Sequence, residues 1–212
     1  MKQIYEKLYQ SSIYFPPMDF TIHQYLLASD PALLFAAGTV QQANMILPEI
    51  QEILGDRELK YIFVSHMESD EAGGVFVFHK AYPNVIVICS ELAARELPGW
   101  GYDGAVSTKC GKDELKEGEL SLRFADYPSE VHDQNGIVCF EENSGIVYSA
   151  DLFLRYGNGA GNTVKASWKD EVNTIQSDFV VSDEKRESLK GSLLEWEPSF
   201  VAVGHGFCIK CE

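Results

Sequence analysis

Short apolar runs alternate with helically spaced apolar residues along this chain. The spacing over residues 41–54 predicts a helix that ends at Gly55. Residues 61–64 are β-branched or aromatic and predict a buried strand. A second helix over about 72–80 and a second strand over 84–89 follow, so the pattern β–α–β is predicted in the first half of the chain.

The rest of the chain is predicted to contain mainly short strands. Segments 22–27 and 32–35 predict a hairpin that turns at Ser29-Asp30-Pro31. Glycine and asparagine dominate 155–163, which predicts a flexible loop. Further strands are predicted over 120–124, 136–141, 145–149 and 200–203, and further helices over 91–97 and 184–194. Because β–α–β units occur in both halves, we expect an α/β sandwich and one domain over residues 1–212.

Composition narrows the class of protein. The chain has 212 residues, of which 45% are hydrophobic, enough for a buried core. Its longest apolar stretches, such as 85–88, are far shorter than the ~20 residues that a membrane-spanning helix needs. The N-terminus lacks the apolar core of a signal peptide. We therefore expect a cytoplasmic protein that has no membrane partner.

Charge and cysteine content limit the partners and the compartment. The formal net charge is −15, with 32 acidic against 17 basic residues, which argues against nucleic acid as a partner. Part of this acidity could be neutralised by bound metal. The five cysteines are an odd number and imply no disulfide framework, which fits a reducing compartment.

Candidate metal ligands occur at four places, each next to a predicted strand. After the strand at 61–64, alternate residues of an extended turn point the same way, so His66, Glu68 and Asp70 can converge. Loops at strand ends are where binding sites are usually built. The complete set of candidates is His66, Glu68, Asp70, Glu71, His132, Asp151 and His205, the last of which lies between two glycines.

Each candidate taken alone has a simpler explanation. A single histidine is usually structural, and we assign His23 and His79 in that way. Asp151 alone is more typical of a helix cap. The acidic turn at 68–71 alone is typical of a solvated helix N-terminus. The presence of all four places in one chain, in this order, favours a metal site.

This order of residues resembles the metallo-β-lactamase superfamily, and in particular its flavodiiron and oxygen-binding di-iron branch. Hydrolases of the superfamily carry histidine where Glu68 stands, so Glu68 distinguishes the branch. The resemblance extends from about residue 22 to residue 206 and implies an αββα sandwich. It also implies that one metal is held by His66, Glu68 and His132, the other by Asp70 and His205, and that Asp151 bridges the two.

Glu71 departs from the pattern, because the family has a second histidine there. It could bind the second metal through oxygen, bind nothing, or leave a place for water. A carboxylate at this position would make the site more negative and favour oxidised metals. Mixed imidazole and carboxylate ligands suit iron or manganese, whereas zinc hydrolase sites prefer histidine and cysteine. We expect two iron ions, with zinc or manganese as alternatives.

The resemblance implies a protein that binds dioxygen and reduces it, or nitric oxide, if a separate donor supplies electrons. The alternatives are a binuclear metallohydrolase and a non-catalytic sensor that a signalling partner reads. A flavodoxin domain with its FMN would need on the order of 100–150 residues, and only six follow Gly206, so we expect no FMN domain in this chain. A homodimer stays open, because relatives that carry the flavodoxin domain pair head to tail.

Two smaller features complete the candidates. Cys208 and Cys211 could form a redox pair, part of a metal site shared with another molecule, or two thiols on a frayed tail. Phe153 and Tyr156 follow Asp151 and could line an oxygen pocket, although core packing explains Phe153 equally well.

Overall fold

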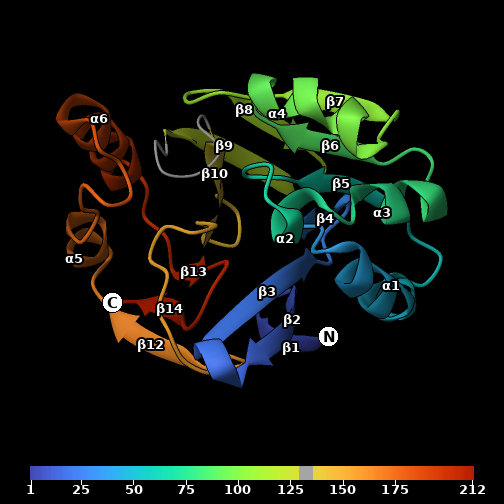
Figure 1. Ribbon diagram of the computed structural model, residues 1–212, viewed down its shortest axis with the longest axis horizontal. Coiled ribbons are helices and arrows are strands. Elements are labelled where there is room, and N and C mark those ends of the chain that lie inside the picture. The colour runs from blue at the N-terminus through green and yellow to red at the C-terminus, as the bar shows by residue number, and fades with distance from the viewer. Residues whose placement is uncertain (129–135) are drawn as a thin grey trace.

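A computed structural model describes residues 1–128 and 136–212, which form two sheets packed face to face (Figure 1). The first sheet has the spatial order β1 (Lys2–Tyr5), β2 (Leu8–Phe15), β3 (Phe20–Leu27), β4 (Ala32–Phe35), β5 (Leu59–Phe63), β6 (Ile86–Cys89) and β7 (Ala105–Thr108). The second has the order β12 (Thr163–Ala166), β14 (Cys208–Cys211), β13 (Phe200–Ala202), β11 (Ile146–Tyr148), β10 (Gly136–Glu141), β9 (Leu120–Tyr127) and β8 (Glu114–Glu117).

Helices cover the outer faces of both sheets (Figure 1). The helices over the first sheet are α1 (Val40–Leu54), α2 (Ser69–Ala72), α3 (Val75–Ala81) and α4 (Glu91–Glu96). Those over the second are α5 (Trp168–Asn173) and α6 (Asp183–Leu194). The described residues also include two short 3-10 helices, η1 (Pro16–Met18) and η2 (Leu97–Trp100). Buried side chains form one apolar layer between the sheets and one beneath each set of helices. The predicted αββα sandwich is confirmed.

Local sequence explains the elements that were predicted. Helix α1 begins at a capping box, in which Thr39 and Gln42 satisfy each other's backbone N–H groups, and it ends at Gly55 with φ +60°. The predicted hairpin is present as the antiparallel pair β3–β4. The predicted helix over 72–80 is interrupted at Gly74, where a Cβ atom would lie 2.5 Å from the Ala37 carbonyl oxygen.

Strand direction brings distant segments to one edge of the sandwich. Strands β4, β5 and β6 run parallel to one another in the first sheet, and β11 and β13 run parallel in the second. Parallel strands end at the same edge, so the segments after β5, β11 and β13 can meet there. The two sheets are joined at this edge by a bridge between Ile22 and His205 and by a 3.0 Å hydrogen bond from the His23 N–H to the Gly204 carbonyl.

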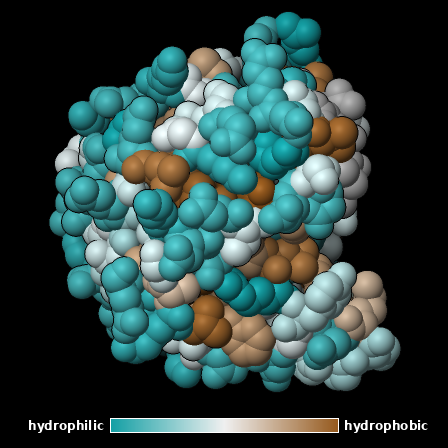
Figure 2. Space-filling view, turned by 90° about the vertical axis from the view of Figure 1, so that its left-hand side faces the viewer, coloured by the Kyte–Doolittle hydropathy of each residue, from teal (hydrophilic) through white to brown (hydrophobic). Residues whose placement is uncertain are grey.

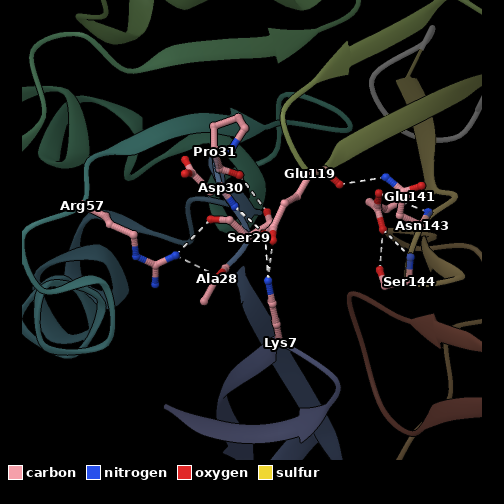
Figure 3. A network of polar contacts seen from close by, with 10 residues as sticks. All are labelled: Lys7, Ala28, Ser29, Asp30, Pro31, Arg57, Glu119, Glu141, Asn143 and Ser144. Carbon is pink, nitrogen blue, oxygen red and sulfur yellow. Dashed lines mark hydrogen bonds and ion pairs between the residues drawn. The ribbon is translucent and has the colours of Figure 1, made fainter.

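Polar contacts close the sandwich elsewhere, around a cleft of about 700 Å3 (Figure 3). Lys7 Nζ lies 2.7 Å from the Glu119 carboxylate, which also accepts a hydrogen bond from the Asp30 N–H at 2.9 Å. The buried Glu141 carboxylate accepts hydrogen bonds from the Ser121 and Ser144 N–H groups. Protein donors therefore satisfy the carboxylates of Glu119 and Glu141 in this cleft.

The surface over α5 and α6 is mostly hydrophilic, with small and separated hydrophobic areas (Figure 2). This agrees with the net charge of −15. No helix in residues 1–128 or 136–212 has both the length and the apolar character needed to cross a bilayer.

Several elements were not predicted. They are β1, β2, β7, β8, β12, β14 and α5, all of which are short or lack a clean apolar period. Strand β2 has polar residues at its centre, and its pairing with β3 over eight residues stabilises it. These strands are fixed by their partners in the sheet rather than by local sequence.

The loop predicted over 155–163 is present as irregular backbone up to β12, which begins at Thr163, but hydrogen bonds tie it to the start of β3 and the residue before it. The N–H groups of Gly157 and Gly159 donate hydrogen bonds to the Asp19 carbonyl and the Thr21 hydroxyl at 2.7 and 3.0 Å. A Cβ atom on Gly159 would lie 1.8 Å from the Gly206 carbonyl oxygen. Glycine is required here because two backbones pack closely, and not because the chain needs freedom.

We predict opposite effects from two glycine substitutions. Gly159→Ala should lower the free energy of unfolding by about 2 kcal/mol or more, because its methyl group has no space. Gly191→Ala should raise it by about 0.5–1 kcal/mol, because Gly191 is exposed inside α6 with nothing near its Cβ position. Urea unfolding of both variants measures the difference. Equal stability of wild type and Gly159→Ala would contradict the close packing.

Candidate metal centre

The first group of candidate ligands lies on the turn between β5 and α2. Glu68 is extended, with φ −77° and ψ 160°, directly before the first residue of α2. Met67 points into the apolar layer beneath the helices, whereas Ser69 is exposed. The expected alternation therefore holds from His66 to Glu68, and Asp70 follows in the first turn of α2.

His66, Glu68 and Asp151 form one half of the site. His66 Nε2 lies 3.8 Å from Glu68 Oε2 and 3.7 Å from Asp151 Oδ2. One donor atom from each of the three residues lies within 4.8 Å of the others. Ligand atoms bound at about 2.0–2.2 Å to a single ion lie at comparable mutual distances. The donor set fits one metal ion.

Asp70, Asp151 and His205 form the other half. His205 Nε2 lies 3.2 Å from Asp151 Oδ1 and 3.6 Å from Asp70 Oδ2. The two carboxylate oxygens of Asp151 thus face different histidines, Oδ2 toward His66 and Oδ1 toward His205. Asp151 is 4% exposed and follows β11 directly after Ala150, whose φ is +48°. This arrangement suits a carboxylate that bridges two ions.

The start of β3 orients His205. His205 Nδ1 lies 3.1 Å from the Thr21 carbonyl oxygen, to which it donates its proton, so Nε2 is the nitrogen that could bind a metal ion. The Phe20 ring stacks on the imidazole with a centroid separation of 4.4 Å. Gly206, with φ +84°, allows the chain to turn tightly after His205. A Cβ atom there would lie 2.0 Å from the Arg155 carbonyl oxygen.

The carboxylates control protonation of both histidines. Burial alone would lower the pKa of His66, but Glu68, Glu71 and Asp151 raise it to about 9. Burial is likewise outweighed at His205, where Asp151 and Asp70 raise the pKa. Burial raises the pKa of Asp70. The cluster therefore attracts positive charge, which protons supply in the metal-free protein and which metal ions can supply instead.

Glu71 has a different environment from the other candidates. It is 4% exposed, its Oε2 accepts a hydrogen bond from the Ser65 N–H at 3.3 Å, and its Oε1 accepts one from the Tyr148 hydroxyl. Burial raises the pKa of this carboxyl to about 7. Both carboxylate oxygens are engaged by protein donors.

The remaining candidates are dispersed. His132 lies outside the described residues. Phe153 is buried in the layer beneath α5 and α6, where its ring meets Trp168 edge-on at 5.5 Å, so these contacts place it in the core rather than in a pocket. Tyr156 is 68% exposed and packs on Phe20 at 6.0 Å, which places it at the rim of the His205 side.

The structure adds residues that sequence patterns did not single out. Phe20 and Thr21 orient His205, while Ser65 and Tyr148 hold Glu71. Phe20, Thr21 and Tyr148 are ordinary strand residues in sequence. Their roles depend on contacts between strands, for which a single sequence offers no marker.

Of the three alternatives for Cys208 and Cys211, the structure contradicts two thiols on a frayed tail. Cys208 and Cys211 lie in β14, which pairs with β12 and β13. Cys208 belongs to the layer between the sheets, and its Sγ lies 3.2 Å from the Tyr25 hydroxyl. Cys211 packs on the opposite face, against the layer beneath α5 and α6. Because the thiols lie on opposite faces of one strand, they cannot form a disulfide with each other without rearrangement of the strand.

The family model described as ODP family beta lactamase matches residues 20–206. The chain is 24% identical over 141 residues to the coenzyme F420H2 oxidase of Methanothermobacter marburgensis, a match that covers 63% of this chain and 34% of the oxidase.

Solved structures share the fold. Rubredoxin oxygen:oxidoreductase from Desulfovibrio gigas superposes with a TM-score of 0.77 at 16% identity, covering 99% of this chain and 57% of that one. The flavodiiron protein from Giardia intestinalis gives a TM-score of 0.77 at 15% identity, covering 100% of this chain and 56% of that one. The chain thus spans between a third and three fifths of the lengths of these relatives.

We predict that the metal-free protein loses stability as the pH rises. The pKa of His66 is about 9 in the folded protein, against an ordinary value of 6.5 for an exposed histidine. The stabilisation of the folded protein by protonated His66 is fully present below pH 6.5 and is lost as the pH rises through about 9. The difference between the two pKa values corresponds to at most about 3.5 kcal/mol in the free energy of unfolding. Urea unfolding in chelator between pH 6 and 10 measures it.

His66→Gln should remove this part of the pH dependence. His79→Gln, on α3, is the matched control and should leave it in place. The same pH profile in wild type and His66→Gln would show that the carboxylates do not act on His66 in this way.

Proposed function

Since the chain belongs to the family described as ODP family beta lactamase, we propose that it is a non-haem di-iron protein that binds dioxygen. We further propose that it reduces dioxygen or nitric oxide when a donor supplies electrons. The observation that carries the proposal is the position of Asp151, whose two oxygens face His66 and His205 separately.

The donor chemistry favours iron. Each half combines one imidazole with carboxylates, which suits iron or manganese better than zinc. Glu68 contributes a carboxylate where zinc hydrolases of this fold carry histidine, and this counts against the metallohydrolase alternative. We propose that His132 completes the half formed by His66 and Glu68.

The protein's own residues define what the site can do. Two bound irons would supply electrons and open coordination positions for a diatomic ligand. Asp151 would bind both ions, one through each oxygen of its carboxylate. The Thr21 carbonyl keeps His205 in the tautomer that can bind a metal, and the Phe20 ring covers one face of that imidazole and limits the access of water.

Electrons would reach the site from a carrier outside the sandwich. The described helices and strands all belong to the two sheets and their covering helices, and the sheets share one inner layer, so we treat residues 1–212 as one domain. The names of two relatives, a coenzyme F420H2 oxidase and a rubredoxin oxygen:oxidoreductase, support a redox carrier as partner.

Metal content tests the proposal first. The purified full chain should contain two irons, and Asp151→Ala should lose both, because Asp151 faces both histidines. His205→Ala should lose only one. Asp103→Ala, at an exposed position, is the control and should keep both. Elemental analysis of each variant measures this. Two zincs per chain together with rapid ester hydrolysis would favour the metallohydrolase.

Oxygen reactivity tests the second part. Dioxygen added to the reduced, iron-loaded protein should change its visible absorption. Addition of a chemical reductant should then produce continuous oxygen uptake if the protein is a reductase. A spectral change with no uptake would favour a sensor, and an unchanged spectrum would contradict oxygen binding.

A further inference from the structure

Glu71 connects two ligand-bearing segments that belong to different sheets. Its Oε2 accepts the N–H of Ser65, which lies two residues after the end of β5 and directly before His66. Its Oε1 accepts the hydroxyl of Tyr148, the last residue of β11 and three residues before Asp151. One side chain thus ties the His66 turn of the first sheet to the Asp151 turn of the second.

Tyr148 is held rigidly on its side of this connection. The residue is fully buried, and its ring stacks on Phe35 at 5.2 Å and meets Phe63 edge-on at 5.9 Å. Both phenylalanines belong to the first sheet, so the ring itself is packed across the inner layer. The hydroxyl therefore has a fixed position from which to bind the Glu71 carboxylate.

The backbone of Glu71 is fixed as well. Its carbonyl accepts the N–H of Ala37 at 2.7 Å, and its N–H donates to the Glu68 carbonyl at 3.2 Å. With backbone and both carboxylate oxygens engaged, a move of Glu71 onto a metal ion would leave the buried Tyr148 hydroxyl without its acceptor. Leaving a buried polar group unsatisfied is costly.

We propose that Glu71 is not a metal ligand but a positioning residue that sets the distance between the His66 turn and Asp151. This inference rests on the proposed two-metal function and goes beyond it. Because Asp151 faces both halves of the site, loss of the connection would weaken the binding of both metal ions. Loss of a ligand at this position would weaken the binding of only the ion near Asp70 and His205. The two roles therefore differ in the number of ions affected.

Manganese(II) binding to the metal-free full chain tests the inference. Calorimetry measures both affinities, and electron paramagnetic resonance detects the coupled pair of ions. Glu71→Ala and Tyr148→Phe should each lower the affinity for both manganese ions about 10–100-fold, as is typical for residues that support ligands. The double variant should bind manganese with the same affinity as Glu71→Ala, because both substitutions break the same connection.

Two further variants complete the design. Tyr102→Phe removes another buried tyrosine hydroxyl, which bonds the Ala105 carbonyl at 2.8 Å away from the site, and should bind manganese like wild type. Glu71→Gln can still accept from Ser65 and donate to the Tyr148 oxygen, so it should keep both ions and the coupled signal even if Glu71→Ala does not fold.

The outcomes separate this inference from the proposed function. Loss of one ion in Glu71→Ala or Glu71→Gln, with both retained in Tyr148→Phe, would show that Glu71 is a ligand and would overturn the inference alone. A wild-type chain that binds no manganese and contains no iron would overturn the proposed function, and the inference with it.

Discussion

Asp151 presents one buried carboxylate to two imidazoles that come from different sheets. His66 approaches from the end of β5 and His205 from the segment after β13, and each faces a different oxygen of the same carboxylate. Anionic carboxylates that are buried this deeply are unfavourable unless cations balance them. In the metal-free protein the raised pKa values of both histidines supply that balance. The same demand for positive charge would suit a bound metal ion.

Much of the surrounding structure serves to bring these segments together. The bridge between Ile22 and His205 fastens β3 to the second sheet, and Thr21 and Phe20 then fix the imidazole. Close backbone packing of Gly206 against the segment that contains Gly159 leaves no room for side chains. The rigidity of the site thus comes from backbone contacts as much as from ligand side chains. A glycine-rich segment that suggests flexibility in the sequence is therefore tied down by close backbone contacts in the structure.

Glu71 has different surroundings from the other carboxylates of its turn. In sequence, the acidic turn at 68–71 offers several equivalent carboxylates. In the structure they differ, because Glu68 and Asp70 face histidines while Glu71 is held by backbone and hydroxyl donors. The distinction depends on Tyr148, which approaches from the opposite sheet. Neighbouring residues of one turn therefore have different chemistry because they face different sides of the sandwich.

The sequence by itself determined the α/β sandwich, and it singled out the candidate residues of the site. The spacing of apolar residues predicted the buried strands and helices such as α1. The polar residues at strand ends gave His66, Glu68, Asp151 and His205 as candidates, and the structure brings these four together. Both signals are local properties of the sequence. Tertiary structure alone decided the edge strands, the order of the glycine-rich loop and the two faces on which the thiols of β14 lie. It also decided which carboxylate faces which histidine. These features depend on contacts with residues far away in the sequence, and the pattern of one sequence does not show which distant residues come into contact.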